Sequence, residues 1–295
     1  MIVGIIDVGS NSVRLLVGDV AGEEVRQLRR ERVYVRLGDD AYRFGSISEG
    51  KLDETHAVAT RFAGIAFECG AEHLETIVTA PGRQASNPDD LVRALATATH
   101  APVVLLSAAD EGCLAWEGAV ARLEEPPEVV GVIDLGGGSC ELAVGTPSLG
   151  PAWVRSFEAG ALRVTRAFLK RDPPRPRSVA RARDEIARLL ALDAAPPRPA
   201  LTLAVGGTAR AVARALGCRF GVDDLENLAD RLALLPAKKI ADRYDVTRPR
   251  AQTLLGGTLV LAELARAVGT DLELGRGGLR EGAALALARA EAVAA

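Results

Sequence analysis

The sequence of 295 residues contains little cysteine and histidine, and few aromatic residues. Its four cysteines are isolated from one another, form no C-x-x-C pair and have no histidine at ligand spacing. This pattern argues against a zinc finger or ribbon and predicts buried thiols in a reducing compartment. The three histidines, His56, His73 and His100, lie outside every motif described below, so we expect no histidine base.

Long hydrophobic runs are also missing. No uncharged apolar stretch of about 18 residues occurs, so we expect no membrane span. The first residues, MIVGIIDVG, reach Asp7 without the basic and apolar regions of a signal peptide. Together these absences predict a cytoplasmic protein that does not act at a membrane.

The net charge of −3 gives no global indication of nucleic-acid binding, and we expect no nucleic-acid partner. The charge is nevertheless uneven, because residues 155–220 hold fourteen Arg or Lys residues against five Asp or Glu residues. Such an asymmetry can steer an anionic ligand to one face of a protein. A solvated, arginine-rich helix surface is the alternative interpretation.

Hydrophobic residues make up 48% of the chain and charged residues 25%, as in an ordinary globular protein. The length predicts two domains, with one large domain as the alternative. A polar, proline-bearing segment, EEPPE at 124–128, is the predicted boundary, which gives domains of residues 1–125 and 126–295. The sequence leaves open whether the last helix, from Leu279, packs back on the first domain.

Apolar runs and helical periodicity alternate along the chain, which predicts an α/β fold. In the first half we expect strands at 2–8, 13–20, 24–37, 74–80 and 102–106, and helices at 48–69, 89–99 and 108–123. In the second half we expect strand, turn and strand at 129–145, then strand, turn and helix at 201–216. The remainder is predicted to be mostly helical, with a short strand at 271–274.

The chain contains one informative internal repeat. IVGIIDVGSNSVRLLVG near the N-terminus and VVGVIDLGGGSCELAVG from Val129 each consist of an apolar strand, an Asp, a turn of small residues and a second apolar strand. Asp7 and Asp134 occupy the same place in the two copies. The repeat therefore predicts two related domains, each presenting an Asp and a turn of backbone amides.

Turns of this kind are suited to phosphate. Exposed amides in a tight turn form an anion-binding concavity, and the adjacent Asp offers a hard oxygen to Mg²⁺. The glycines at 136–138 let the backbone approach a phosphate without a Cβ in the way, and VGGTA at 205–209 adds a third turn. Ordinary hairpin turns are the alternative, which the matched copies disfavour.

Two other nucleotide-binding motifs are not supported. GSISEGKL at 45–52 has the spacing of a P-loop, but Leu52 stands where Mg²⁺ needs a Ser or Thr hydroxyl. No G-x-G-x-x-G occurs, so a dinucleotide site is not indicated.

Seven segments occur in one order along the chain: DVGSNSVRLLV (7–17), TAPGRQASN (79–87), SAADEGCLA (107–115), DLGGGSCEL (134–142), FEAGALRVT (157–165), VGGTA (205–209) and GRGGLREG (275–282). Together they resemble the exopolyphosphatase / guanosine pentaphosphate phosphohydrolase family from residue 2 to residue 285. The resemblance implies two ribonuclease-H-like domains of the actin / Hsp70 / sugar-kinase superfamily, flanking an interdomain cleft. This implied fold agrees with the internal repeat.

The resemblance also implies a role for each matching position. It assigns Mg²⁺ binding to Asp7, Asp134 and Glu141. Catalysis falls to Glu111 as the general base and to Glu141, which helps to hold the metal or the attacking water. The implied phosphate-binding set comprises Arg14, Arg83, Gly9, Ser10, Asn11, Ser12, Gly136, Gly137, Gly138, Ser139, Gly206, Gly207 and Thr208.

One segment departs from the family's pattern. The residues around the base usually read Ser-Gly-x-Glu-Glu-Ala, whereas here they run Ser-Ala-Ala-Asp-Glu-Gly from Ser107, so that Glu111 is kept and its neighbour is shortened to Asp110. Longer members carry a C-terminal helical extension. This chain therefore resembles the short, two-domain form, with a homodimer as a candidate assembly.

The sequence thus predicts Mg²⁺-dependent removal of terminal phosphate from inorganic polyphosphate. Phosphoryl transfer to water requires charge neutralisation, a placed water and a proton acceptor, which these residue types supply. Hydrolysis of guanosine pentaphosphate is the close alternative. An actin-superfamily kinase and a catalytically weak polyphosphate or alarmone sensor are rivals from other classes.

Overall fold

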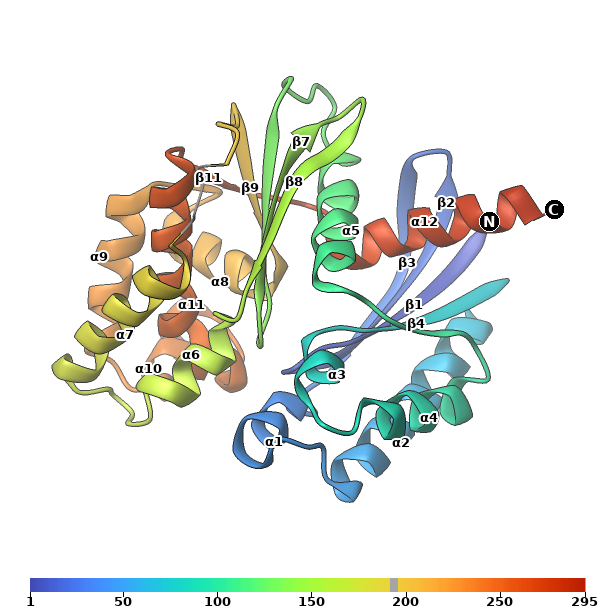
Figure 1. Ribbon diagram of the computed structural model, residues 1–295, viewed down its shortest axis with the longest axis horizontal. Coiled ribbons are helices and arrows are strands. Elements are labelled where there is room, and N and C mark those ends of the chain that lie inside the picture. The colour runs from blue at the N-terminus through green and yellow to red at the C-terminus, as the bar shows by residue number, and fades with distance from the viewer. Residues whose placement is uncertain (192–195, 295) are drawn as a thin grey trace. The chain divides into compact units, whose positions relative to one another are not determined.

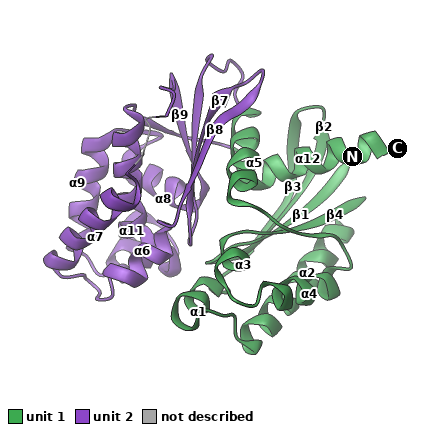
Figure 2. Cartoon of the chain, in the orientation of Figure 1, with its two compact units in different colours: residues 1–122, 277–295 green, residues 123–276 purple. Residues whose placement is uncertain are grey.

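The computed structural model describes residues 1–191 and 196–294. They form two compact units, coloured separately in Figure 2: unit 1 comprises Met1–Arg122 and Gly277–Ala295, and unit 2 comprises Leu123–Arg276. The chain enters unit 2 just before the EEPPE segment and returns to unit 1 at Gly277. The last helix therefore belongs to unit 1, the arrangement that the sequence left open.

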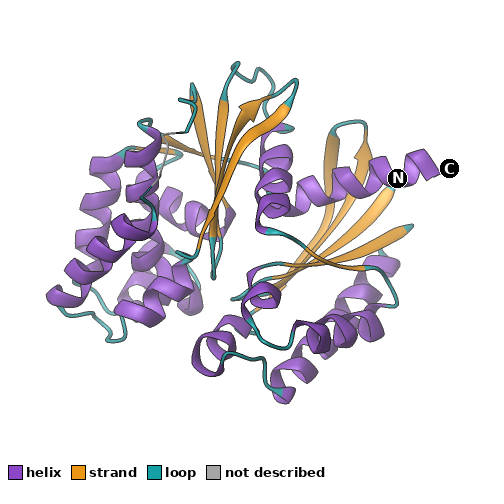
Figure 3. Ribbon diagram, viewed as in Figure 1, coloured by secondary structure: helices purple, strands orange, loops and turns teal. Residues whose placement is uncertain are grey.

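Unit 1 is built on a five-stranded sheet of order β3-β2-β1-β4-β5. β1 pairs antiparallel with β2, and β2 with β3, whereas β4 and β5 extend the sheet in parallel (Figure 3). The strands are β1 (Ile2–Val8), β2 (Val13–Ala21), β3 (Glu24–Val33), β4 (His73–Val78) and β5 (Val103–Leu105).

Alternate residues of β1 point to opposite faces of this sheet, as in any strand. Ile6 and Val8 pack in a core with α2 and α4, while Val3 and Ile5 pack in a second core with α5 and α12. The strand is buried on both faces, which explains its nearly continuous apolar sequence. The helices of unit 1 are α1 (Leu37–Phe44), α2 (Glu49–Glu68), α3 (Ala80–Gln84), α4 (Pro88–Thr99), α5 (Ala108–Val120) and α12 (Leu279–Ala294).

Unit 2 is built on a six-stranded sheet of order β10-β11-β9-β6-β7-β8. Its strands are β6 (Val130–Leu135), β7 (Cys140–Thr146), β8 (Gly150–Phe157), β9 (Leu201–Val205), β10 (Arg219–Phe220) and β11 (Leu272–Leu274). Its helices are α6 (Ala161–Phe168), α7 (Pro176–Leu189), α8 (Gly206–Leu216), α9 (Val222–Ala233), α10 (Ala237–Tyr244) and α11 (Arg248–Val268), labelled in Figure 1.

The two sheets share one topology. The order β3-β2-β1-β4-β5 of unit 1 returns as β8-β7-β6-β9-β11 in unit 2, with β10 added at the edge. In each unit an antiparallel meander of three strands is followed by parallel strands. The predicted ribonuclease-H-like fold and the internal repeat are therefore confirmed.

Some predicted elements differ from the structure. The strand expected at 24–37 ends at Val33, because Arg36 adopts a left-handed conformation and α1 begins at Leu37. The strand expected at 74–80 ends at Val78, and β8 was not predicted. The expectation of buried thiols is correct for Cys140 and wrong for Cys218, which is exposed. Within the described residues, no helix has both the length and the apolar character needed to cross a membrane.

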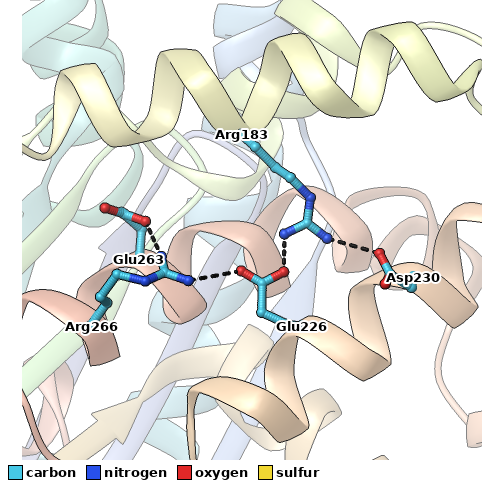
Figure 4. Close-up of polar contacts among 5 residues, drawn as sticks. All are labelled: Arg183, Glu226, Asp230, Glu263 and Arg266. Carbon is cyan, nitrogen blue, oxygen red and sulfur yellow. Dashed lines mark hydrogen bonds and ion pairs between the residues drawn. The ribbon is translucent and has the colours of Figure 1, made fainter.

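An ion-pair network joins three helices of unit 2 (Figure 4). Arg183 of α7 pairs with Glu226 of α9, and its Nη2 lies 2.9 Å from Asp230 Oδ1. Arg266 of α11 pairs with Glu263, and its Nη2 lies 3.1 Å from Glu226 Oε1. Part of the positive charge of residues 155–220 is therefore neutralised within the helical layer.

Candidate functional site

The first predicted phosphate turn, residues 9–12, connects β1 and β2. Its carbonyl oxygens are held by backbone hydrogen bonds: Ser12 accepts from Gly9 at 3.2 Å, Ser10 from Gly38 at 2.8 Å and Asn11 from Arg36 at 3.2 Å. The start of α1 thus fastens the carbonyl side of the turn. Tight turns whose carbonyls are held in this way present their N–H groups to an anion.

A buried hydroxyl in this turn has no partner. Ser10 is 3% exposed, and its Oγ makes no hydrogen bond to any residue in the described part of the chain. Buried polar atoms are normally satisfied, so an unpartnered one needs an explanation. A bound phosphate or cation would supply the partner that Ser10 lacks.

Asp7 lies directly across the β1–β2 ladder from Arg14 and is flanked by two arginines. Arg14 Nη1 lies 3.6 Å from Asp7 Oδ2, and Arg280 Nε of α12 lies 4.0 Å from the same oxygen. Burial lowers the pKa of Arg280 to about 10, and the neighbouring charge of Arg14 adds to the lowering. Arg280 stays charged at neutral pH, so the surroundings of Asp7 are electropositive.

Glu111 stands in the first turn of α5, also in unit 1. Ser107 caps this helix, because its Oγ accepts a hydrogen bond from the Asp110 amide at 3.1 Å and donates to Asp110 Oδ2 at 2.6 Å. The shortened neighbour of Glu111 therefore completes the helix cap. The helix begins at Ala108, as predicted.

Glu111 is 5% exposed and paired with an arginine. Arg83 Nη2 lies 2.7 Å from Glu111 Oε2, and Arg83 Nη1 donates to the Leu106 carbonyl at 3.0 Å. Arg83 comes from the short helix α3, which follows β4. The structure thus brings together two of the predicted site residues that lie far apart in the sequence.

The second turn, residues 136–139, connects β6 and β7 in unit 2. Its carbonyls receive the first amides of α6: Ala161 donates to Gly136 at 3.0 Å, and Leu162 to Gly137 at 3.0 Å. A Cβ on Gly160 would lie 2.3 Å from the Gly137 carbonyl, so only glycine permits this approach. As in unit 1, the carbonyl side of the turn is fastened by a following helix.

Asp134 and Glu141 face each other across the β6–β7 ladder, the positions that Asp7 and Arg14 hold in unit 1. Glu141 is 1% exposed, and its Oε1 accepts a hydrogen bond from Ser156 Oγ at 2.8 Å. Burial raises the pKa of the neighbouring Cys140 well above its usual value, and the carboxylates of Glu141 and Asp134 raise it further. Cys140 therefore stays a protonated thiol.

The third turn leads into α8 and lies beside the Asp134 carboxylate. A Cβ on Gly206, whose φ is +90°, would lie 3.0 Å from Asp134 Oδ1. Arg250 of α11 is buried over this turn, and its Nη1 donates to Thr208 Oγ1 at 2.9 Å. A Cβ on Gly207 would lie 2.4 Å from Arg250 Nη2. The turn therefore needs both glycines to accommodate its charged neighbours.

The predicted site residues are divided between the two units. Unit 1 holds Asp7, Gly9, Ser10, Asn11, Ser12, Arg14, Arg83 and Glu111, and unit 2 holds Asp134, Gly136, Gly137, Gly138, Ser139, Glu141, Gly206, Gly207 and Thr208. In the part of the chain that the structure describes, no three His, Cys, Asp or Glu residues lie close enough to hold a metal ion together.

Four supporting residues were not predicted: Arg280, Arg250, Ser156 and Gly160. Arg280 lies within the segment GRGGLREG and Gly160 within FEAGALRVT. These motifs indicated that the two segments belong to the site, but they did not predict which residues Arg280 and Gly160 contact. Arg250 and Ser156 lie in no predicted motif, and they reach the site through tertiary packing.

Residues 16–291 match the model of the Ppx/GppA phosphatase family. Exopolyphosphatase 2 of Mycobacterium tuberculosis is 30% identical over 290 residues, covering 90% of each chain. An exopolyphosphatase-like protein of known structure superposes with a TM-score of 0.88 over 97% of each chain, at 22% identity. The structure of the Aquifex aeolicus member of the Ppx/GppA family superposes with a TM-score of 0.81 over 99% of this chain and 98% of that one, also at 22% identity.

Proposed function

The chain belongs to the Ppx/GppA phosphatase family and is a phosphohydrolase; from this premise we propose that it removes the terminal phosphate of inorganic polyphosphate with the help of Mg²⁺. The name of the Mycobacterium tuberculosis relative supports the substrate, since the two chains match over nine-tenths of their lengths. The type of bond cleaved is a phosphoanhydride.

The observation that carries this proposal is the fastening of the first and second turns. In each unit the carbonyls between the paired strands accept hydrogen bonds from a following segment, at Arg36 and Gly38 in unit 1 and at Gly160–Leu162 in unit 2. Backbone amides held in such turns bind phosphoryl oxygens without reorganising. Repeated phosphate binding suits a substrate made of repeated phosphates.

Mg²⁺ fits the residues present. This cation prefers oxygen ligands, keeps several waters, and is usually held by one or two carboxylates together with substrate phosphates. Asp7, with the Ser10 hydroxyl three residues further along the chain that lacks a partner among the described residues, and Asp134, which faces the buried Glu141 across the β6–β7 ladder, offer such donors. When bound, Mg²⁺ would neutralise charge on the phosphoryl oxygens. We propose Asp7 as a Mg²⁺ ligand in unit 1, and Asp134 and Glu141 as Mg²⁺ ligands in unit 2.

Glu111 is assigned the role of general base. Its carboxylate accepts a proton from water as the water oxygen forms a bond to the terminal phosphorus and the bridging P–O bond breaks. The products are orthophosphate and a chain shortened by one unit. Arg83 holds Glu111 in place through the 2.7 Å ion pair and places positive charge beside the phosphoryl group.

Orthophosphate release with Mg²⁺ or with EDTA tests the proposal on short polyphosphate, long polyphosphate, guanosine pentaphosphate and ATP. We expect Mg²⁺-dependent release from polyphosphate that is largely lost in Asp7→Asn. Preferred release from guanosine pentaphosphate would replace polyphosphate as the substrate. No release from any substrate, with polyphosphate still bound, would overturn hydrolysis and leave a sensor.

A further inference from the structure

The helix that fastens the second phosphate turn leads directly away from it. The amides of Ala161 and Leu162, at the start of α6, donate to the turn, and the helix spans eight residues to Phe168, a length of about 12 Å. Arg163 and Arg166 stand three residues apart on this helix, and Lys170 follows four residues later. The spacing places Arg163 and Arg166 on one face of α6, whereas Lys170 lies two residues beyond the end of the helix. Basic residues therefore follow one another from the second turn to the far end of α6, and Arg163 among them is paired with Glu158.

A cluster of exposed lysine and arginine residues lies at that far end. Asp172 Oδ1 accepts a hydrogen bond of 2.7 Å from the Ala237 amide at the start of α10. This bond joins the segment that contains Lys170 and Arg171 to the start of α10, where Lys238 and Lys239 follow Ala237. All four side chains are exposed, and none forms an ion pair or hydrogen bond with any other described residue.

The acidic residues nearby leave this charge largely uncompensated. Glu158 pairs with Arg163 at the turn end of α6, and one carboxylate oxygen of Asp172 is occupied by α10. Asp242 is one helical turn beyond Lys238, without an ion pair to it among the described residues. The arginines farther along α7 contrast with this cluster, because Arg183 and Arg188 are paired with carboxylates.

We propose that these cations form a basic track for the part of a polyphosphate chain distal to the cleaved end. The basic track comprises Arg163, Arg166, Lys170, Arg171, Lys238 and Lys239, all in unit 2. A flexible polyanion whose end occupies the second turn runs along α6 and reaches Lys170, Arg171, Lys238 and Lys239, the four cations without an ion pair among the described residues. The inference rests on the proposed function, to which it adds a determinant of chain-length preference.

Charge, and not shape, makes this surface suited to a polyanion. Side chains on long flexible stems cannot define a stereospecific pocket, but each contacted phosphate releases counterions and strengthens binding. The contribution therefore grows with the number of phosphates that reach the basic track. Tripolyphosphate is too short to extend from the second turn along the whole of α6. It therefore gains little binding energy from the cations at the far end of the basic track.

The test compares two variants that lose the same charge. The track variant carries Lys170→Gln, Arg171→Gln, Lys238→Gln and Lys239→Gln. The control carries Arg26→Gln, Arg93→Gln, Arg188→Gln and Arg219→Gln, four exposed arginines that each pair with a carboxylate elsewhere. The quantity measured is the ratio of kcat/KM for long-chain polyphosphate to kcat/KM for tripolyphosphate, at several salt concentrations.

We expect this ratio to fall about tenfold in the track variant and by less than twofold in the control. The dependence of log KM on log salt for the long chain should flatten by roughly 0.7 for each lost contact. Equal ratios in the two variants would overturn the basic track. If neither substrate is hydrolysed, the proposed function fails, and the track is judged by the binding of labelled long-chain polyphosphate: weaker binding in the track variant supports it, and equal binding in both variants overturns it.

A single-stranded RNA of similar charge serves as the competing polyanion. If the track variant loses RNA binding but keeps its affinity for polyphosphate, the surface is a nucleic-acid site and the proposal is wrong. If polyphosphate displaces RNA and both bind the track variant more weakly, the basic track is supported.

Discussion

Arg83 and Glu111 form an ion pair of 2.7 Å in unit 1, although they lie on different helices. Glu111 is 5% exposed, so the interaction is poorly screened by water. A second hydrogen bond, from Arg83 to the Leu106 carbonyl, fixes the guanidinium to the segment that precedes α5. The carboxylate that we propose as general base is thus oriented by Arg83, which we also propose to place positive charge beside the substrate.

Glu111→Gln should lower kcat by about 10²–10⁴-fold while KM changes little. The amide keeps the size of the side chain and can still contact Arg83, but it cannot accept the proton from water. Steady-state orthophosphate release measures both constants. Glu117→Gln on the exposed side of the same helix, where Glu117 pairs with Arg289, is the matched control and should retain activity. A Glu111→Gln enzyme with normal kcat would remove Glu111 from catalysis.

Gly160→Ala should destabilise unit 2 and reduce activity together. The added Cβ would lie 2.3 Å from the Gly137 carbonyl, so α6 or the second turn must move. Overpacking of this kind costs about 1–3 kcal/mol. Urea denaturation measures the free energy of unfolding. KM for polyphosphate measures how well the second turn still binds phosphate.

Gly64→Ala is the control for this substitution, because a Cβ at Gly64 in α2 meets no atom within 4 Å. There alanine should stabilise the helix by about 1 kcal/mol. If Gly160→Ala proved as harmless as Gly64→Ala, α6 would not be fastened to the turn in the way described.

Cys140 should resist alkylation in the native protein, whereas Cys218 should react. Burial raises the pKa of the Cys140 thiol well above its usual value, and the thiolate is the reactive form. Cys218 is exposed. Iodoacetamide labelling followed by peptide mass spectrometry distinguishes the two positions, with urea-unfolded protein as the control in which both react. Native labelling of Cys140 ahead of Cys218 would contradict the burial of β7 beside the second turn.

Local patterns in the sequence were sufficient to predict the two strand–turn–strand copies. Their strands are buried on both faces, so they read as apolar runs, and their turns are rich in small residues. The strand β8 escaped prediction because it begins with a glycine and a proline and is only partly buried along most of its length. The helix α1 escaped because its start depends on the left-handed conformation of Arg36.

The charged neighbours of the site were harder to predict, because they arrive from distant parts of the chain. Arg280 reaches Asp7 from the other end of the sequence, and Arg250 reaches Thr208 from the start of α11. No local spacing encodes such contacts. The contact between Arg280 and Asp7 accompanies close packing of α12 on α5. A Cβ on Gly282 would lie 1.9 Å from the Leu114 carbonyl of α5, so the two helices pack this closely only because residue 282 is a glycine.

Arg280 and Asp7 should show energetic coupling. Arg280→Met leaves Asp7 with Arg14 alone and removes a buried cation from a cluster that also contains Glu281, so the expected cost is about 3 kcal/mol. Asp7→Asn removes the opposite charge while keeping the shape. Because Arg280 Nε lies 4.0 Å from Asp7 Oδ2, the double variant should lose less stability than the sum of the two single variants, by about 1 kcal/mol or more.

Urea denaturation of the wild type, both single variants and the double variant completes the cycle. Arg30→Met provides a comparison, since Arg30 pairs with Glu281 and makes no ion pair with Asp7 among the described residues. It should couple less strongly to Asp7→Asn than Arg280→Met does. Additivity of Arg280→Met and Asp7→Asn within about 0.3 kcal/mol would mean that the C-terminal helix does not hold the carboxylate. Coupling would instead make α12 part of the phosphate-binding apparatus of unit 1, because the residue that orients Asp7 comes from the segment that returns from unit 2.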